Sequence, residues 1–177
     1  MRYFIGYLIK GQAKQYHNNL CSNLANEFGI KYLPYKVPSH LTLKAPFETE
    51  DITQIEKILE QFSEKNKKSK LELEGFGHFG NRVIFIGVKP NEKMKEGYSH
   101  LLDSLKKVDG LTWSEFEGKG ANFHATIATK GIEEVFEEMW GYISTLEKPH
   151  FELDFDNIAL LKYEAGKWLI HKEYSIN

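Results

Sequence analysis

The same short pattern, histidine-x-threonine followed by an apolar residue, occurs twice in the sequence, as His40-Leu41-Thr42-Leu43 and as His124-Ala125-Thr126-Ile127. In a chain of 177 residues with 7 histidines and 7 threonines, chance predicts fewer than one histidine-x-threonine pair. Residues i and i+2 of a β-strand share a face, so each histidine is expected beside its threonine, with the apolar neighbours turned into a core. Two such polar faces, brought together, would line a groove with two imidazoles and two hydroxyls.

This set of side chains suits the opening of a cyclic phosphodiester, which needs a base for the attacking water and an acid for the departing oxygen. An imidazole, with an ordinary pKa of about 6.5, can serve as either near neutral pH. Threonine hydroxyls can donate hydrogen bonds to the non-bridging phosphate oxygens as charge develops on them. The sequence therefore predicts acid–base catalysis by His40 and His124, assisted by Thr42 and Thr126, that needs no metal or other cofactor.

Two simpler interpretations of the histidines compete with this one. A single histidine-x-threonine pair on a strand is usually a packed or surface histidine, but two pairs at equivalent points of a repeat favour a shared role. Two histidines could also hold zinc together with a carboxylate; the chain, however, has no His-x-x-x-His pattern, a single cysteine and no acidic residue in either motif. The remaining histidines lack a repeated context and are expected on the surface or in the core: His17, His78, His100, His150 and His171.

Hydrophobic periodicity and turn residues predict the elements that would position the two motifs. Helices are expected near residues 12–28, 51–62, 91–108 and 133–144, with Gly29 as a stop for the first. The Glu164-Ala165-Gly166 link predicts that the last two strands form a hairpin. Strands are expected at Arg2–Ile9, His40–Leu43, Leu71–Glu74, Arg82–Val88, Phe123–Thr129, Phe151–Phe155, Ile158–Tyr163 and Lys167–Tyr174.

The order of elements restarts halfway along the chain, which indicates an internal duplication. Phe4-Ile5-Gly6-Tyr7 matches Phe85-Ile86-Gly87-Val88, and the histidine follows the phenylalanine by 36 residues in the first half and 39 in the second. We expect one domain, residues 1–177, made of two pseudo-symmetric α+β lobes of roughly residues 1–80 and 81–177. Strand exchange between the lobes is expected as well.

Composition limits the classes of partner. The net charge of −2 argues against a strongly basic protein that wraps nucleic acid, so a nucleic-acid ligand would be short and held by a local cationic groove. Cys21 is the only cysteine, which excludes an intrachain disulfide and fits a reducing compartment. The apolar run Tyr3–Ile9 is too short for a membrane span and has no signal-peptide pattern. We expect a cytoplasmic monomer that is not attached to a membrane.

The paired motifs, together with Gly75-Phe76-Gly77-His78-Phe79 and the strand after it, resemble the two-histidine (2H) phosphoesterase superfamily. This superfamily includes the 2′-5′ RNA ligase-like proteins of bacteria and archaea and the cyclic phosphodiesterases of plants and fungi. The resemblance implies a bilobal fold in which two antiparallel sheets form a central groove with helices on the outside. It also implies a substrate with a 2′,3′-cyclic phosphate or a 2′-5′ linkage, with His124 as the base and His40 as the acid.

Residues that would hold the rest of the substrate are less clearly marked. Thr129 stands where many RNA ligase-like members have arginine, which disfavours a long RNA substrate and ligation. Strand alternation places Lys44 on the face of His40 and Thr42, where it could supply positive charge, whereas Lys130 should point to the opposite face of a regular strand. Base stacking would need an aromatic residue, for which the candidates are Tyr35, Phe47, Tyr163 and Trp168. The substrate-binding candidates are then Lys44, Tyr163, Lys130 and Tyr35.

Three functions remain open at this point. The first is hydrolysis of cyclic phosphates on nucleotides or RNA ends. The second is an RNA 2′-5′ ligase or 2′-5′ phosphodiesterase, whose affinity for a long RNA should weaken steeply with added salt. The third is a module that binds nucleotide or RNA ends without turnover.

Overall fold

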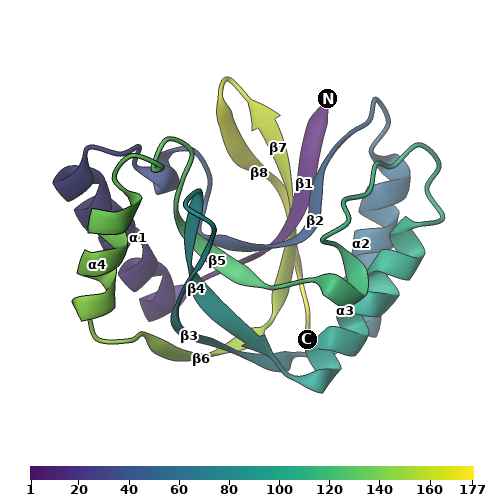
Figure 1. The fold of residues 1–177 in the computed structure, drawn as a ribbon. Coiled ribbons are helices and arrows are strands. Elements are labelled where there is room, and N and C mark those ends of the chain that lie inside the picture. Colours follow the sequence, from purple (N-terminus) through teal and green to yellow (C-terminus); the bar gives the residue numbers. More distant parts are fainter.

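Two antiparallel sheets form the centre of the molecule (Figure 1). The computed structural model describes residues 1–177, except for the side chain of Lys119. Within this described part, the first sheet has four strands in the order β2-β1-β7-β8, and the second has four in the order β5-β4-β3-β6. The strands are β1 (Arg2–Leu8), β2 (His40–Glu48), β3 (Ser69–Phe79), β4 (Val83–Pro90), β5 (His124–Thr129), β6 (His150–Phe155), β7 (Asn157–Glu164) and β8 (Lys167–Ser175).

Helices lie on two flanks of this centre. In Figure 1, α1 (Gly11–Phe28) and α4 (Phe136–Thr145) cover one flank, and α2 (Thr53–Lys65) and α3 (Glu92–Leu105) cover the other. Two short 3-10 turns, η1 (Leu33–Tyr35) and η2 (Gly118–Gly120), precede β2 and β5. The helices in the described part of the chain are all too short or too polar to cross a membrane.

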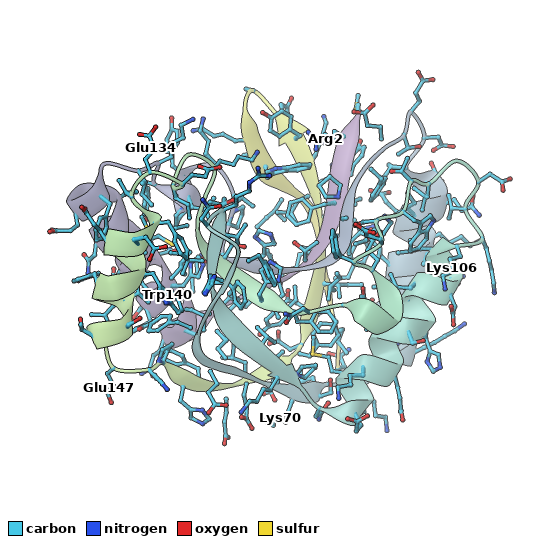
Figure 2. All side chains as sticks on the ribbon, viewed as in Figure 1. Arg2, Lys70, Lys106, Glu134, Trp140 and Glu147 are labelled. Atoms are coloured by element: carbon cyan, nitrogen blue, oxygen red, sulfur yellow. The ribbon has the colours of Figure 1, made fainter. Side chains whose placement is uncertain are left out.

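One continuous core joins both sheets and the helices. Residues Ser69, Leu71 and Leu73 of β3 are buried in alternation, as expected for a strand with one face turned to a core, whereas β1 from Tyr3 to Leu8 and β7 from Asn157 to Leu161 are buried at every position. Charged side chains such as Lys70, Lys106, Glu134 and Glu147 lie at the periphery (Figure 2). Core residues with almost no exposed surface include Ile5, Leu24, Leu41, Leu59, Leu73, Ile86, Leu102, Ile143 and Ile158.

The predicted α+β class, with two antiparallel sheets and outer helices, is confirmed. Gly29, with φ at 65°, ends α1 in the left-handed conformation that favours glycine, as its position predicted. Some boundaries were wrong: β3 is much longer than the expected Leu71–Glu74, because Gly75 at φ 65° allows a bulge after which pairing with β4 resumes. The helices α3 and α4 are shorter than expected.

The two halves of the sequence contribute to both sheets. β7 and β8 come from the second half and pair beside β1, while β3 comes from the first half and pairs between β4 and β6. β1 and β4 occupy equivalent places, each next to a strand that begins with a motif histidine. The strand pairing does not follow the sequence match of Phe4–Tyr7 with Phe85–Val88. Thr42 lies opposite Gly6 and Thr126 lies opposite Phe85, so the structural equivalent of Phe85 is Gly6, two residues beyond Phe4.

The pairing of β1 with β7 joins segments that are far apart in the sequence. The buried amide of Asn157 exchanges two hydrogen bonds with the backbone of Leu8, accepting at 2.9 Å and donating at 3.1 Å. Near the end of the chain, Ile176 is fully buried in the core. The first strand is therefore fixed by residues almost 150 positions later, which matters for how the fold forms.

Candidate active site

The two motif histidines occupy matching positions. His40 is the first residue of β2 and His124 is the first residue of β5, and each of these strands forms the edge of its sheet. The two edge strands contact each other where the sheets meet (Figure 1). The fold thus brings together the two motifs that the sequence singled out.

Both imidazoles are held by the same kind of hydrogen bond. His40 Nδ1 lies 2.8 Å from the carbonyl oxygen of Pro38, and His124 Nδ1 lies 2.7 Å from that of Asn122. A carbonyl oxygen can only accept, so Nδ1 carries the proton in each ring, and Nε2 of the neutral ring has a free lone pair. Each histidine is therefore oriented to take or give a proton through Nε2.

Phenylalanines fix the planes of the two rings. Phe4 packs against His40 with ring centroids 4.8 Å apart, and Phe85 packs against His124 at 5.1 Å. Phe79 adds an edge-on contact to His124 at 4.9 Å. Gly77 leaves the space for Phe85, because a Cβ there would lie 2.6 Å from its ring. Such packing limits ring rotation and removes water from one side of each imidazole.

Burial makes both imidazoles poor proton acceptors. Loss of hydration lowers the pKa of His40 to about 4, opposed by its bond to the Pro38 carbonyl and reinforced by the neighbouring His17 and His124. Burial also lowers the pKa of His124, opposed by the Asn122 carbonyl. Both rings are neutral at pH 7 in the free protein. An acid–base pair would need one of them to gain a proton, which a bound phosphate anion would favour.

A groove of about 480 Å³ lies beside the motifs. Three of the four predicted catalytic residues line it: His40, Thr42 and Thr126. His124 is not among the described lining residues; it lies two residues before Thr126 on the same face of β5, with its ring edge-on to that of Phe79. The rest of the lining comes from Phe4, Lys31, Leu33, Lys36, Val37, Pro46, Thr129, Lys130, Tyr163, Gly166 and Trp168.

Two of the four substrate-binding candidates line this groove. Tyr163 does, with its ring edge-on to Trp168 at 5.1 Å. Lys130 does too, although alternation placed it on the opposite face; β5 ends at Thr129, and Lys130 has a left-handed φ of 58° that redirects its side chain. Tyr35 is not among the described lining residues and is 61% exposed.

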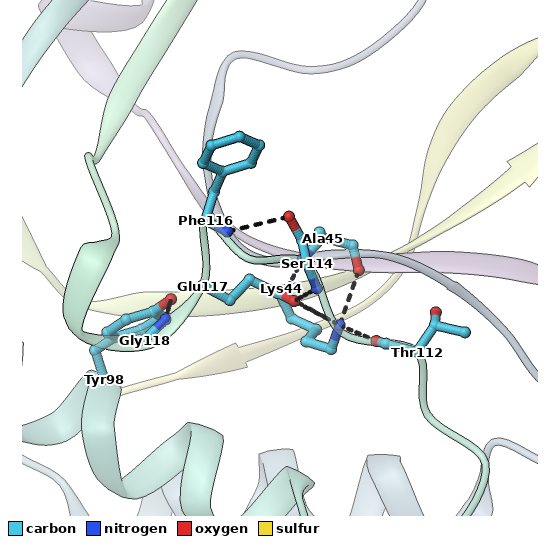
Figure 3. Close-up of polar contacts among 8 residues, drawn as sticks. All are labelled: Lys44, Ala45, Tyr98, Thr112, Ser114, Phe116, Glu117 and Gly118. Atoms are coloured by element: carbon cyan, nitrogen blue, oxygen red, sulfur yellow. Dashed lines mark hydrogen bonds and ion pairs between the residues drawn. The ribbon is translucent and has the colours of Figure 1, made fainter.

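The prediction that Lys44 faces the groove is wrong. Gly6 pairs with Thr42 and Ile5 with Lys44, so β2 has one extra residue here and the alternation of side chains breaks. The Lys44 side chain is fully buried, with Nζ 3.1 Å from a carboxylate oxygen of Glu117 (Figure 3). Lys44 therefore holds the segment before β5 against β2 and does not meet a ligand.

His17 is a buried residue near the site that the sequence interpretation did not single out. Its Nε2 lies 2.8 Å from the carbonyl oxygen of Thr126, and its Nδ1 lies 2.9 Å from the hydroxyl of Ser39, which precedes His40. His17 thus connects the two motifs. Its position on the buried stripe of α1, four residues before Cys21, could have indicated burial but not these partners.

A group of possible metal ligands exists away from the motifs. Glu72, Glu74 and His150 have ligand atoms within 4.8 Å of one another on β3 and β6. Lys89 already forms an ion pair with Glu74. Within the residues that the structure describes, this is the single group of this kind, and it includes neither motif histidine.

The chain is similar to known proteins over most of its length. The family model of the 2′-5′ RNA ligase superfamily matches residues 22–167. A Bacillus pumilus (strain SAFR-032) protein named "Putative phosphoesterase" is 26% identical over 159 residues, covering 86% of this chain and 88% of that protein. A similarly named protein of Geobacillus sp. (strain WCH70) is 27% identical over 161 residues, with 87% and 88% covered.

Solved structures share the fold at lower identity. Escherichia coli LigT complexed with 3′-AMP superposes with a TM-score of 0.65 at 14% identity, over 99% of this chain and 98% of that chain. A crystal structure described as a phosphoesterase gives a TM-score of 0.63 at 14% identity, over 99% and 98%. These likenesses extend over both sheets.

Proposed function

The chain belongs to the 2′-5′ RNA ligase superfamily, and on that premise we propose that it is a metal-independent phosphoesterase of 2′,3′-cyclic phosphates on nucleotides or RNA ends. The observation that carries the proposal is the matched pair of imidazoles, His40 and His124, each with Nδ1–H held by a backbone carbonyl. A nucleotide ligand also fits the fold, because LigT of E. coli was crystallised with 3′-AMP and with ATP.

The reaction needs two proton transfers. His124 removes a proton from water, the water oxygen bonds to phosphorus, and the bond from phosphorus to one ribose oxygen breaks. His40, protonated, gives its proton to that ribose oxygen, which leaves a 2′- or 3′-phosphomonoester. The hydroxyls of Thr42 and Thr126 donate hydrogen bonds to the non-bridging oxygens as negative charge builds up.

Exposure to the groove supports His40 as the acid. Because His40 lines the groove, the negative charge of a bound phosphate lies beside it and raises its pKa from about 4 toward neutrality. His124 is not among the described lining residues, and burial lowers its pKa, so it enters the reaction neutral, as a base must. After one turnover the proton has moved from His40 to His124, and solvent restores the starting state.

The first test compares His40→Asn and His124→Asn with wild type on adenosine 2′,3′-cyclic phosphate in EDTA. Loss of a general acid or base slows turnover by about 10²–10⁴-fold. His100→Asn, an exposed change on α3, is the matched control and should keep full activity. Wild-type activity that disappears in EDTA, or either site variant retaining activity, would contradict the proposal.

A substrate with a good leaving group separates the two roles. A nitrophenyl phosphodiester needs no protonation of its leaving oxygen, so the variant without the acid should recover most of its activity on it. His40→Asn is therefore expected to hydrolyse the nitrophenyl ester much faster than His124→Asn does. The reverse order would exchange the roles of base and acid while leaving the paired mechanism intact.

The alternative functions give different outcomes in the same assays. A 2′-5′ ligase runs the ring opening with a ribose hydroxyl in place of water, so joined oligonucleotides would accumulate when RNA ends are supplied at high concentration. A binding module would retain nucleotide in all three proteins without turnover in any of them.

A further inference from the structure

Three lysines line the same groove as the motif residues: Lys31, Lys36 and Lys130. All three are exposed, and none has a carboxylate within 4.0 Å among the side chains that the structure describes. The described lining also includes no aspartate or glutamate. In a chain with a net charge of −2, this groove is therefore a local site of uncompensated positive charge.

Aromatic side chains from β1 and from the β7–β8 hairpin line the groove as well. Trp168 lies edge-on to Phe4 at 4.8 Å and edge-on to Tyr163 at 5.1 Å. The Arg2 guanidinium lies 5.6 Å from the centre of the Trp168 ring. An aromatic surface of this kind accepts a nucleobase by stacking, which leaves the lysines to meet the charged part of a ligand.

The cyclic phosphate alone does not account for these lysines. A cyclic phosphodiester has one negative charge, and the hydroxyls of Thr42 and Thr126 and a protonated His40 already meet its oxygens in the proposed reaction. The three ammonium groups are therefore left without a counter-charge in that reaction and are available to a second anion. An ammonium binds phosphate well as a point charge.

We propose that Lys31, Lys36 and Lys130 bind a second phosphate of the same substrate. The preferred substrate is then a nucleotide with a cyclic phosphate at the scissile position and at least one more anionic phosphate. This inference rests on the proposed phosphoesterase function and narrows its substrate class. The second phosphate is either the internucleotide phosphate of an RNA end or a 5′-phosphate on a single nucleotide.

The rim of the groove extends the positive charge. The ammonium groups of Lys167 and Lys36 lie 3.5 Å and 5.4 Å from the centre of the Tyr35 ring. A hydrogen bond from Lys167 and its charge hold the pKa of the Tyr35 hydroxyl below its ordinary value. A short ligand chain leaving the groove past Tyr35 would thus meet one further cation, Lys167.

Four substrates test the inference by their kcat/KM values on wild type. They are adenosine 2′,3′-cyclic phosphate, the same compound with a 5′-phosphate, a diadenosine dinucleotide ending in a cyclic phosphate, and that dinucleotide with a neutral methylphosphonate linkage. We expect kcat/KM about tenfold or more higher with a second anionic phosphate, since about 1.4 kcal/mol corresponds to tenfold. The methylphosphonate should lose this gain, which separates charge from stacking of the second base.

The double variant Lys31→Gln/Lys36→Gln should remove most of that gain and reduce its dependence on salt. Lys57→Gln/Lys107→Gln removes the same charge from exposed positions outside the groove and should leave the ratio between substrates unchanged. Preference for the 5′-phosphate over the dinucleotide would identify a phosphorylated nucleotide as the source, and the opposite preference an RNA end.

Four results are decisive. Equal kcat/KM for all four substrates, or equal losses for all of them in the groove double variant, would refute the second-phosphate site while leaving the phosphoesterase function in place. Full activity of the methylphosphonate dinucleotide would refute it too. No turnover of any substrate by wild type would instead refute the proposed function itself.

Discussion

Glu117→Gln is expected to be among the most damaging single changes outside the groove. The Glu117 side chain is 8% exposed and faces the fully buried Lys44 at 3.1 Å. Its two carboxylate oxygens also accept hydrogen bonds from the backbone N–H groups of Ala45 at 2.7 Å and Ser114 at 2.6 Å. Glutamine has one oxygen where the carboxylate has two, so its NH₂ group would face a donor whichever way the amide is turned.

The expected loss of stability follows from the buried Lys44 ammonium that remains in the variant. The Lys44 ammonium keeps the carbonyl oxygen of Thr112 at 2.7 Å but loses its counter-charge in a site without solvent. Removing one partner of a buried ion pair costs about 3–5 kcal/mol. With a urea m value of about 2 kcal/mol per M, the unfolding midpoint should fall by about 1.5–2.5 M. The loss from the ion pair is a large fraction of the free energy of unfolding of a typical domain, which is about 5–15 kcal/mol.

Urea unfolding followed by tryptophan fluorescence measures this directly. Trp113 is a local reporter, because the Lys44 ammonium lies 4.5 Å from the centre of its ring. Asp103→Asn is the matched control, since its pair with Lys106 has a similar distance of 3.0 Å but exposed partners. That change should cost about 0–1 kcal/mol.

A double-mutant cycle decides whether the charge is the cause. Lys44→Met combined with Glu117→Gln removes both charges, so the double variant should be more stable than Glu117→Gln alone. The reasoning is refuted if Glu117→Gln costs less than about 1 kcal/mol, as an exposed pair would. It is refuted equally if the double variant is no more stable than the single one.

Further predictions concern the site and its support. The pH optimum of kcat/KM should lie below the ordinary histidine pKa of 6.5, because one imidazole must be protonated and the other neutral while the pKa values of His40 and His124 are both lowered; an optimum above pH 7 would contradict this. The free energy of unfolding should fall as pH drops from 6.5 toward 4, since the unfolded chain then binds protons that the buried His17 and the motif histidines do not; a flat urea midpoint over this range would argue against it. Gly87→Ala should lower the free energy of unfolding by about 1–3 kcal/mol, because its Cβ would lie 2.7 Å from the backbone oxygen of Glu74; an unchanged melting temperature would show that β3 and β4 move apart without cost. His17→Phe removes both bonds between the motifs and should lower kcat by up to about a hundredfold with the circular dichroism spectrum preserved; an unchanged kcat would show that α1 does not position the site.

The motif strands could be predicted from sequence because the needed information is local. Alternation along a strand places His40 beside Thr42 and buries Leu41, and the repeat shows that the second motif does the same. Lys44 could not be placed by that reasoning, since the bulge that turns it inward arises from pairing between β1 and β2.

Contacts between separate helices and strands could not be predicted from the sequence pattern either. His17 was expected only as a core or surface residue, because its role depends on which strand α1 packs against. Lys130 reaches the groove because β5 ends one residue before it, and the end of a strand is less certain than its centre. The sequence predicted a groove lined by both imidazoles and both threonines; His40, Thr42 and Thr126 line it, and Lys31 and Lys36 join them from loops that alternation does not describe.

The late pairing of β1 has a consequence for how the protein folds in the cell. β1 leaves the ribosome long before its neighbour β7, which begins at Asn157, and the Asn157 amide binds Leu8 across 149 positions. Closing so long a loop is slow, and folds rich in such distant contacts reach the native state in about milliseconds to seconds. Until then, the apolar face of β1 and the open edge beside it are exposed. We therefore expect the groove to form only after β7 and β8, which supply Tyr163 and Trp168 to its lining, have left the ribosome.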